Sequence, residues 1–204
     1  FVKGVVGWID LEADDLSDQL EYYKEFKKLK GFRHVLQGEK QRDFMLRTKF
    51  VRGIGKLKEL GYTYDILIYP DQLGHTLEFV RAFPDQPFII DHLAKPYIKD
   101  GKIDDWKKAM MQIASSENVF CKVSGMVTEA HWRKWNYDDF LPYLDAVANS
   151  FGPQRLLFGS DWPVCLVAAS YEQVIGLVER YFSTFSKDEQ ELIFGKNAVT
   201  FYNL

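Results

Sequence analysis

The chain has 204 residues, a formal net charge of −3 and an isoelectric point near 5.9, and 47% of its residues are hydrophobic. This length fits one domain with a large buried core. No block is rich in lysine and arginine, which argues against nucleic acid as a partner, and no apolar run reaches the roughly 18 residues that span a membrane. The two cysteines lack metal-type spacing, which favours reduced thiols and a cytoplasmic location.

Short runs rich in β-branched and aromatic residues alternate with amphipathic segments. The runs predict strands at residues 5–11, 31–37, 62–69, 87–93, 118–126 and 155–162. Apolar residues at helical spacing predict helices at 14–30, 44–61, 73–83, 104–116, 137–152, 170–185 and 187–203. Gly61 is typical of a residue just after a helix end. Ser186 with Glu189 predicts a capping box at the start of the last helix.

This alternation implies parallel strands joined by crossover helices. Several strands are apolar on both faces, as a sheet covered on both sides requires. An open doubly wound sheet and a (β/α)8 barrel both fit. No GxGxxG or GxxxxGK[ST] sequence occurs, which removes the usual nucleotide-binding interpretation of an open sheet. A complete barrel needs eight strands, so either two strands are absent from this chain or the sheet is open.

Ionisable side chains gather at the carboxyl ends of the predicted strands. They are Asp10, Arg33, His34, Asp91, His92, Lys95, Lys122 and Asp161. Each alone is more often structural, because Asp and Ser end strands through bonds to nearby backbone amides. In a barrel, however, catalytic residues lie at these ends, and convergence concentrates titratable groups in one cleft. A carboxylate base with a histidine and cations to stabilise an oxyanion suits attack of water on an ester-like carbonyl.

Other chemical signals are weaker. His75 and His131 lie on helix-like or loop segments, where a solvated role is expected. The segment WRKWNY (132–137) fits either a sugar-like pocket or surface packing. No GxSxG sequence occurs, and neither Cys121 nor Cys165 lies in a nucleophile motif, so a covalent acyl-enzyme has no support.

Six blocks along the chain form a recognisable pattern: GVVGWIDL, KGFRHVLQ, FMLRTKFVRGIGKLKELGYTYDILI, FPDQPFIIDHLAKP, CKVSGM and RLLFGSDWPVCL. They closely resemble the amidohydrolase-related (amidohydrolase 2) family, in the branch of sugar-acid lactonases such as L-fuconolactonase and L-rhamnono-lactonase and of 2-pyrone-4,6-dicarboxylate lactonase. The resemblance implies an α/β fold, a distorted (β/α)8 TIM barrel, to which this chain contributes about six strands. It also implies a hydrolase of carbohydrate metabolism that opens a small lactone.

The resemblance implies roles for individual residues. Asp161 matches a general-base aspartate after the last strand, and His92 matches a histidine that polarises the substrate carbonyl. Positions implied to bind substrate are Arg33, Lys95, His34 and Lys122, with Asp10 as a further addition. The expected partner is a small-molecule lactone, without nucleic acid or membrane, and the oligomeric state is open.

Family members begin with a strand that ends in a His-x-His motif, followed by a helix and a second strand. No such motif occurs among the histidines of this chain. We therefore expect residues 1–204 to be a single amidohydrolase-like barrel domain that is N-terminally incomplete, which would leave two exposed sheet edges.

Because the His-x-His motif is absent, the sequence leaves open whether the site binds a metal ion. In the wider superfamily the motif helps to bind zinc or a similar divalent ion. His92 and Asp161 offer two ligands, whereas three protein ligands and a water are usual at catalytic zinc, so the site takes either one divalent metal or none. Two alternative functions remain: a zinc-dependent hydrolase or decarboxylase of the superfamily, and a non-catalytic truncated remnant.

Overall fold

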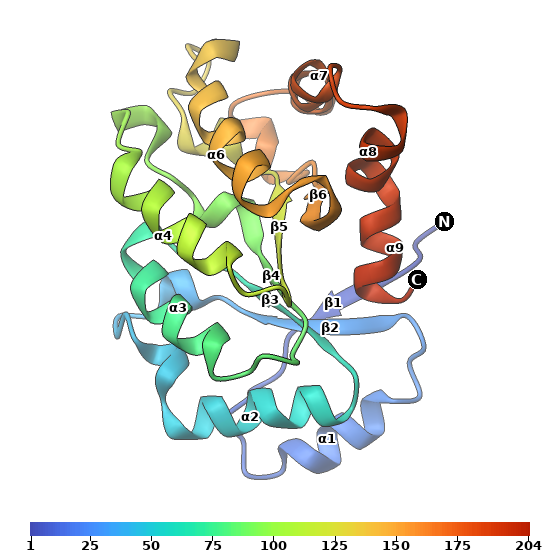
Figure 1. Ribbon diagram of the computed structural model, residues 1–204. Coiled ribbons are helices and arrows are strands. Elements are labelled where there is room, and N and C mark those ends of the chain that lie inside the picture. The colour runs from blue at the N-terminus through green and yellow to red at the C-terminus, as the bar shows by residue number, and fades with distance from the viewer.

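The computed structural model describes all residues, 1–204, and contains one sheet of six parallel strands. The strands are β1 (Val5–Gly7), β2 (Leu29–His34), β3 (Thr63–Ile66), β4 (Phe88–Ile90), β5 (Val119–Val123) and β6 (Leu156–Phe158). Their order in the sheet follows the sequence, so β1 and β6 lie at its edges. The sheet curls into a half-barrel (Figure 1). The predicted α/β class, with six strands of a barrel-type sheet, is confirmed.

Helices follow the strands and cover the sheet. They are α1 (Leu16–Tyr23), α2 (Thr48–Glu59), α3 (Leu73–Arg81), α4 (Asp104–Ala114), α5 (Met126–Glu129), α6 (Leu141–Phe151), α7 (Tyr171–Phe182), α8 (Lys187–Glu191) and α9 (Asn197–Tyr202). In Figure 1, α1 to α4 and α6 lie along one side of the strands, and α8 and α9 lie along the other. None of these helices has the length and apolar character needed to cross a bilayer.

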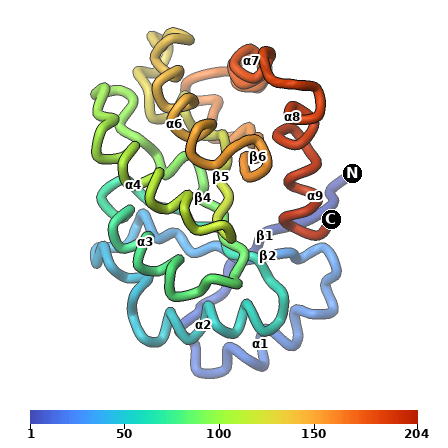
Figure 2. The backbone as a smooth tube through the Cα atoms, viewed as in Figure 1, coloured from blue at the N-terminus to red at the C-terminus, as the bar shows by residue number.

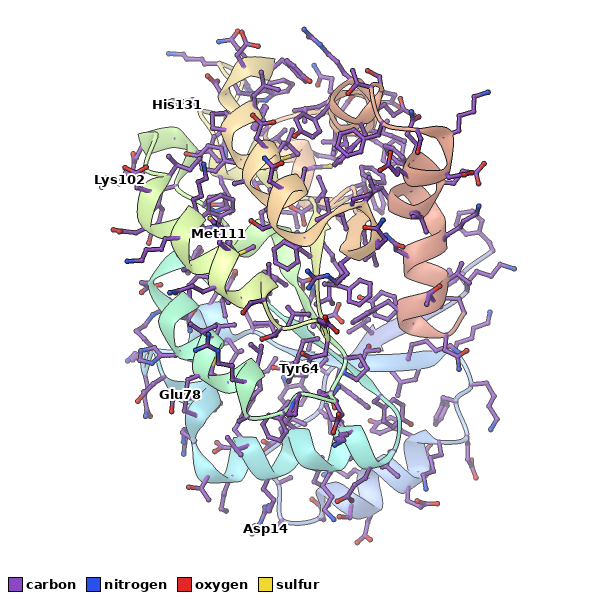
Figure 3. The ribbon with its side chains drawn as sticks, in the orientation of Figure 1. Asp14, Tyr64, Glu78, Lys102, Met111 and His131 are labelled. Atoms are coloured by element: carbon purple, nitrogen blue, oxygen red, sulfur yellow. The ribbon has the colours of Figure 1, made fainter.

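Strand alternation divides the side chains of the sheet between two environments. Tyr64 of β3, labelled in Figure 3, packs on the outer helices, with ring centroids 6.0 Å from Phe50 of α2 and 6.3 Å from Phe79 of α3. The next residue, Asp65, faces the inner side and accepts a hydrogen bond from the hydroxyl group of Tyr202 in α9. Because successive residues of a strand point to opposite faces, the inner face of the half-barrel can collect polar groups while the outer face is apolar.

The C-terminal helix covers part of this inner face. Phe201 of α9 packs with Ile89 of β4 and Leu157 of β6. The two ends of the chain lie side by side (Figure 2), and the Lys30 ammonium donates to the backbone oxygen of Asn203 at 2.7 Å. The C-terminal helix thus packs on apolar side chains of β4 and β6, and the residue that follows it contacts β2.

All six predicted strands are present, but most of their predicted boundaries are too long. The run 87–93 forms a strand only at Phe88–Ile90 because residues 92–95 all have φ between 51° and 56°. Such left-handed backbone cannot continue a sheet ladder. The predicted strand 31–37 also shifts, since β2 begins at Leu29.

The predicted helices are also present, with changes at their ends. The helix predicted over 14–30 ends at Tyr23, because the chain must turn before β2 begins. A π-helical turn at Leu192–Lys196 divides the helix predicted over 187–203. Gly61, with φ of 74°, follows α2 as predicted. The predicted capping box is confirmed, since Ser186 Oγ accepts a hydrogen bond from the backbone N–H of Glu189 at 3.3 Å.

Candidate active site

The two side chains predicted to be catalytic lie side by side at the carboxyl end of the sheet. His92 follows β4, Asp161 follows β6, and His92 Nε2 lies 3.6 Å from Asp161 Oδ1. The other ring nitrogen, Nδ1, lies 2.9 Å from the hydroxyl oxygen of Ser124, which follows β5. The side chains of His92 and Asp161 are only 15% and 11% exposed. A histidine held at one nitrogen and facing a carboxylate with the other suits acid–base chemistry.

Uncommon backbone conformations place this pair. His92 has a φ of 52° and Asp161 a φ of 55°, in the left-handed region that few non-glycine residues adopt. Gly125, with φ of 68°, makes room for the ring, because a Cβ atom there would lie 2.6 Å from His92 Cβ. Strained backbone of this kind persists only where the surroundings hold it, which is common at functional sites.

Burial keeps the His92 imidazole neutral. It lowers the pKa of His92, and the negative charges of Asp91 and Asp161 oppose this only in part. The ordinary pKa of histidine is already near 6.5, so the ring is uncharged at pH 7. The Ser124 hydroxyl can donate to Nδ1, and in that tautomer the proton of the neutral ring is on Nε2, which faces Asp161.

A cluster of paired charges continues from this site along the inner face of the sheet. Lys122 of β5 forms ion pairs with Asp65 of β3 and with Asp91, whose Oδ1 lies 2.7 Å from the ammonium nitrogen. Arg33 of β2 donates to Asp91 Oδ2 at 3.0 Å. The Tyr202 hydroxyl donates to Asp65 Oδ2 at 2.9 Å. Both carboxylates are fully buried, so each depends on its cations to offset the cost of desolvation.

Burial and pairing compete over the ionisation of these groups. Burial raises the pKa of Asp65 to about 6, although Lys122 opposes the shift. Burial also disfavours the charge of Asp91, but Lys122, His92 and Arg33 outweigh it and lower the pKa of that carboxyl group. Burial alone would lower the pKa of Lys122, but the two carboxylates raise it well above its ordinary value. Lys122 and both carboxylates are therefore charged near pH 7.

Lys95 forms a second ion pair beside the histidine. It ends the left-handed turn after β4, and its ammonium nitrogen lies 3.4 Å from Oε1 of Glu129, the last residue of α5. Burial raises the pKa of Glu129, the charge of Lys95 opposes the shift, and the charge of Asp161 adds to it. The charge of Lys95 in turn contributes to the lowered pKa of His92, so this pair lies within the electrostatic reach of the histidine and Asp161.

A pocket of about 390 Å³ opens onto these groups, and its walls include His92, Lys122, Ser124, Asp161 and Tyr202. Pockets of this size suit small molecules. Of the predicted site residues, the structure thus brings Asp161, His92 and Lys122 to one pocket, while Arg33 and Lys95 do not line it and pair with Asp91 and Glu129.

Two predicted residues lie elsewhere. The His34 side chain points to the outer side of the sheet, where Nε2 lies 2.7 Å from Glu39 Oε1 and the ring stacks on Phe44 with centroids 5.2 Å apart. Asp10 is exposed, and its carboxylate accepts a hydrogen bond from the backbone N–H of Glu12 at 2.9 Å. This is the local turn chemistry expected of an aspartate after a strand.

Sequence reasoning did not single out Asp65, Glu129 or Tyr202. Asp65 carries a usable signal, because it interrupts an otherwise apolar and aromatic run, YTYDILIY, in the middle of a buried strand. A buried aspartate needs a partner. Glu129 and Tyr202 carry no comparable signal, since their partners are distant in sequence.

The donor set of this chain does not fit a catalytic metal. No three His, Cys, Asp or Glu side chains among residues 1–204 are arranged to hold one ion. Catalytic zinc usually has three protein ligands and a water, whereas His92 and Asp161 supply two. Residues 1–204 by themselves therefore do not form a catalytic zinc site.

Comparison with known proteins gives consistent matches. The sequence model of the Amidohydro_2 family, described as amidohydrolase, matches residues 1–204. An L-fucono-1,5-lactonase of Burkholderia multivorans is 40% identical over 214 residues, which cover all of this chain and 72% of that protein. An L-fucono-1,5-lactonase of Burkholderia ambifaria is 34% identical over 211 residues, covering all of this chain and 71% of that protein. A crystal structure of an amidohydrolase from Burkholderia multivorans with bound zinc matches at 40% identity with a TM-score of 0.94, covering 99% of this chain and 74% of that chain.

Proposed function

This chain belongs to the amidohydrolase family and is a hydrolase, and we propose that it opens a small, uncharged sugar-acid lactone by attack of water on the ring carbonyl. The observation that carries the proposal is the approach of His92 Nε2 to within 3.6 Å of Asp161 Oδ1 at the wall of a small pocket. The names of the two lactonases that are 40% and 34% identical support the same class of substrate.

In the proposed reaction, Asp161 acts as general base. Its carboxylate takes a proton from a water molecule as the water oxygen attacks the carbonyl carbon of the lactone. The carbonyl oxygen becomes an oxyanion, which accepts hydrogen bonds from His92 Nε2–H and from the Lys95 ammonium. The tetrahedral intermediate then collapses, the bond between the carbonyl carbon and the ring oxygen breaks, and protonated Asp161 returns its proton to the leaving alkoxide. The product is the open hydroxy acid.

The charge cluster supports this chemistry in the proposal. Asp91 directly precedes His92, and its ion pairs with Arg33 and Lys122 fix the backbone from which the histidine extends. Arg33 uses one guanidinium nitrogen on Asp91, and its side chain is 42% exposed, so other donors stay available for a substrate oxygen. Lys122 borders the pocket, which supports its proposed contribution to substrate binding.

The balance of charges favours an uncharged substrate. Arg33, Lys95 and Lys122 each pair with a buried or half-buried carboxylate, from the set Asp65, Asp91 and Glu129. Asp161 adds a further negative charge, and His92 is neutral. Lys30, which also borders the pocket, donates to the backbone oxygen of Asn203. With Lys30 included, the cations and carboxylates balance, so a substrate carboxylate would meet no surplus of positive charge. The hydroxyl groups of a sugar-acid lactone need donors and acceptors but no net charge.

A panel of lactones tests this proposal. Ring opening releases a proton at neutral pH, so a pH indicator follows the rate with uncharged aldonolactones and with lactones that carry a carboxylate. We expect turnover of at least one aldonolactone and a kcat/KM at least tenfold lower for carboxylated lactones, since a mismatched charge costs more than the roughly 1.4 kcal/mol of a tenfold change. Failure to open any lactone in the panel would refute the proposed function. Preference for the carboxylated lactones would refute the assignment of an uncharged substrate.

A further inference from the structure

We propose that Glu129 determines substrate specificity at this site by accepting a hydrogen bond from a hydroxyl group of the lactone. The inference rests on the proposed function and adds a residue that the resemblance to lactonases did not indicate. Glu129 ends the short helix α5, which follows β5 and therefore begins at the same end of the sheet as the His92–Asp161 pair.

The Glu129 carboxylate has one partner in the protein. Its Oε1 atom lies 3.4 Å from the Lys95 ammonium, and no other side chain or backbone group forms a hydrogen bond with it. The side chains of Glu129 and Lys95 are only 20% and 15% exposed. A half-buried carboxylate with a free oxygen can accept a further hydrogen bond, and a low local dielectric makes such a bond stronger than it is in water.

Glu129 also borders a second pocket, of about 530 Å³, whose walls include Tyr97 and Trp132. These two aromatic side chains are 41% and 56% exposed. Trp135, from the same WRKWNY segment, instead packs in the fold and donates from Nε1 to the Ala168 oxygen at 3.1 Å. Of the two interpretations of that segment, packing applies to Trp135, whereas Trp132 is exposed in the wall of the pocket that Glu129 borders.

An acceptor beside a donor is what a hydroxyl group requires, since it both donates and accepts. Glu129 supplies the acceptor and Lys95 the donor, at a separation of 3.4 Å. The other charged groups of the site are less suited to this role, because Asp65 and Asp91 are fully buried in contacts with Lys122. Glu129 is thus the carboxylate through which the site can distinguish a hydroxylated ring from a plain one.

The test compares two lactones with the same six-membered ring. One is a polyhydroxylated aldono-1,5-lactone, and the other is δ-valerolactone, which has no hydroxyl groups. The Glu129→Gln variant keeps the size of the side chain and an oxygen acceptor but loses the charge. Because a hydrogen bond to a charged group is stronger than one to a neutral group, we expect the ratio of kcat/KM values, hydroxylated over unsubstituted, to fall by about tenfold to a hundredfold. The change should arise mainly in KM.

The exposed Glu179 provides a matched control, since Glu179→Gln makes the same chemical change on α7, outside both pockets. Its ratio should equal that of the wild type. An unchanged ratio in Glu129→Gln, or an equal loss of activity on both lactones, would overturn the inference while leaving the proposed function intact. A wild-type protein that opens neither lactone would overturn the proposed function and, with it, this inference.

Discussion

Replacing Gly125 by alanine tests how the fold positions His92. The new Cβ atom would lie 2.6 Å from His92 Cβ, 2.9 Å from Cγ and 3.0 Å from Nδ1. Unbonded carbon atoms prefer about 3.5–4.0 Å, so the ring must move by about 1 Å, which disturbs its contacts with Ser124 and Asp161. A displacement of this size in a catalytic group can lower the rate by about a hundredfold. The left-handed φ of 68° adds a backbone cost of about 1–2 kcal/mol.

Gly101 separates these two effects. It has a φ of 64°, yet a Cβ atom there would have no neighbour within 4 Å. Gly101→Ala should therefore lose about 1–2 kcal/mol of unfolding free energy and keep wild-type kcat/KM. Gly125→Ala should lose at least as much stability and about a hundredfold in kcat/KM. Urea unfolding and lactone turnover measure the two quantities, and equal activity of the two variants would refute the claim that Gly125 positions His92.

Two further predictions concern packing and pH. In α2, Gly53→Ala should destabilise the fold by about 1–3 kcal/mol, because its Cβ would lie 2.3 Å from the backbone oxygen of Leu11. Gly55→Ala should be neutral or stabilising, since no atom lies within 4 Å of a Cβ there. Equal urea unfolding midpoints for the two variants would contradict this packing. Burial raises the pKa of Asp65 to about 6, above its value of about 3.9 in an unfolded chain. The contribution of the Asp65 side chain to the free energy of unfolding should therefore be largest below about pH 4 and be lost as the pH rises through about 6. The unfolding free energy of the wild type minus that of Asp65→Asn should fall over this interval, and a flat difference would show that Asp65 titrates normally.

The sequence predicted the order and type of the elements better than their boundaries. Runs of β-branched and aromatic residues continue past the last paired residue: Leu67 and Ile68 are buried but lie beyond the end of β3. The apolar composition indicates that these residues are buried, whereas the end of the strand depends on where the hydrogen bonds to a neighbouring strand stop. The left-handed turn at His92–Lys95 had no signal, because none of its residues is glycine.

The candidate site was predictable where the chain itself brings residues to a strand end. Asp161 and His92 both follow apolar strands, so the parallel topology alone places them at one end of the sheet. Asp65 lies in the middle of a strand and pairs with Lys122 of another strand. Glu129 pairs with Lys95, which lies in a different loop between strand and helix. Pairings of this kind depend on how the strands curl relative to one another, which residue types and spacing do not specify.

The measurement that tests the central claim most directly is the kcat of Asp161→Asn on a lactone that the wild type opens. Asparagine keeps the size of aspartate and, like it, tolerates the left-handed backbone that position 161 requires, so the variant should fold with an unchanged melting temperature. Without the carboxylate that accepts the proton of water, kcat should fall by about a hundredfold to ten-thousandfold. A folded Asp161→Asn protein with wild-type kcat would contradict the assignment of Asp161 as general base.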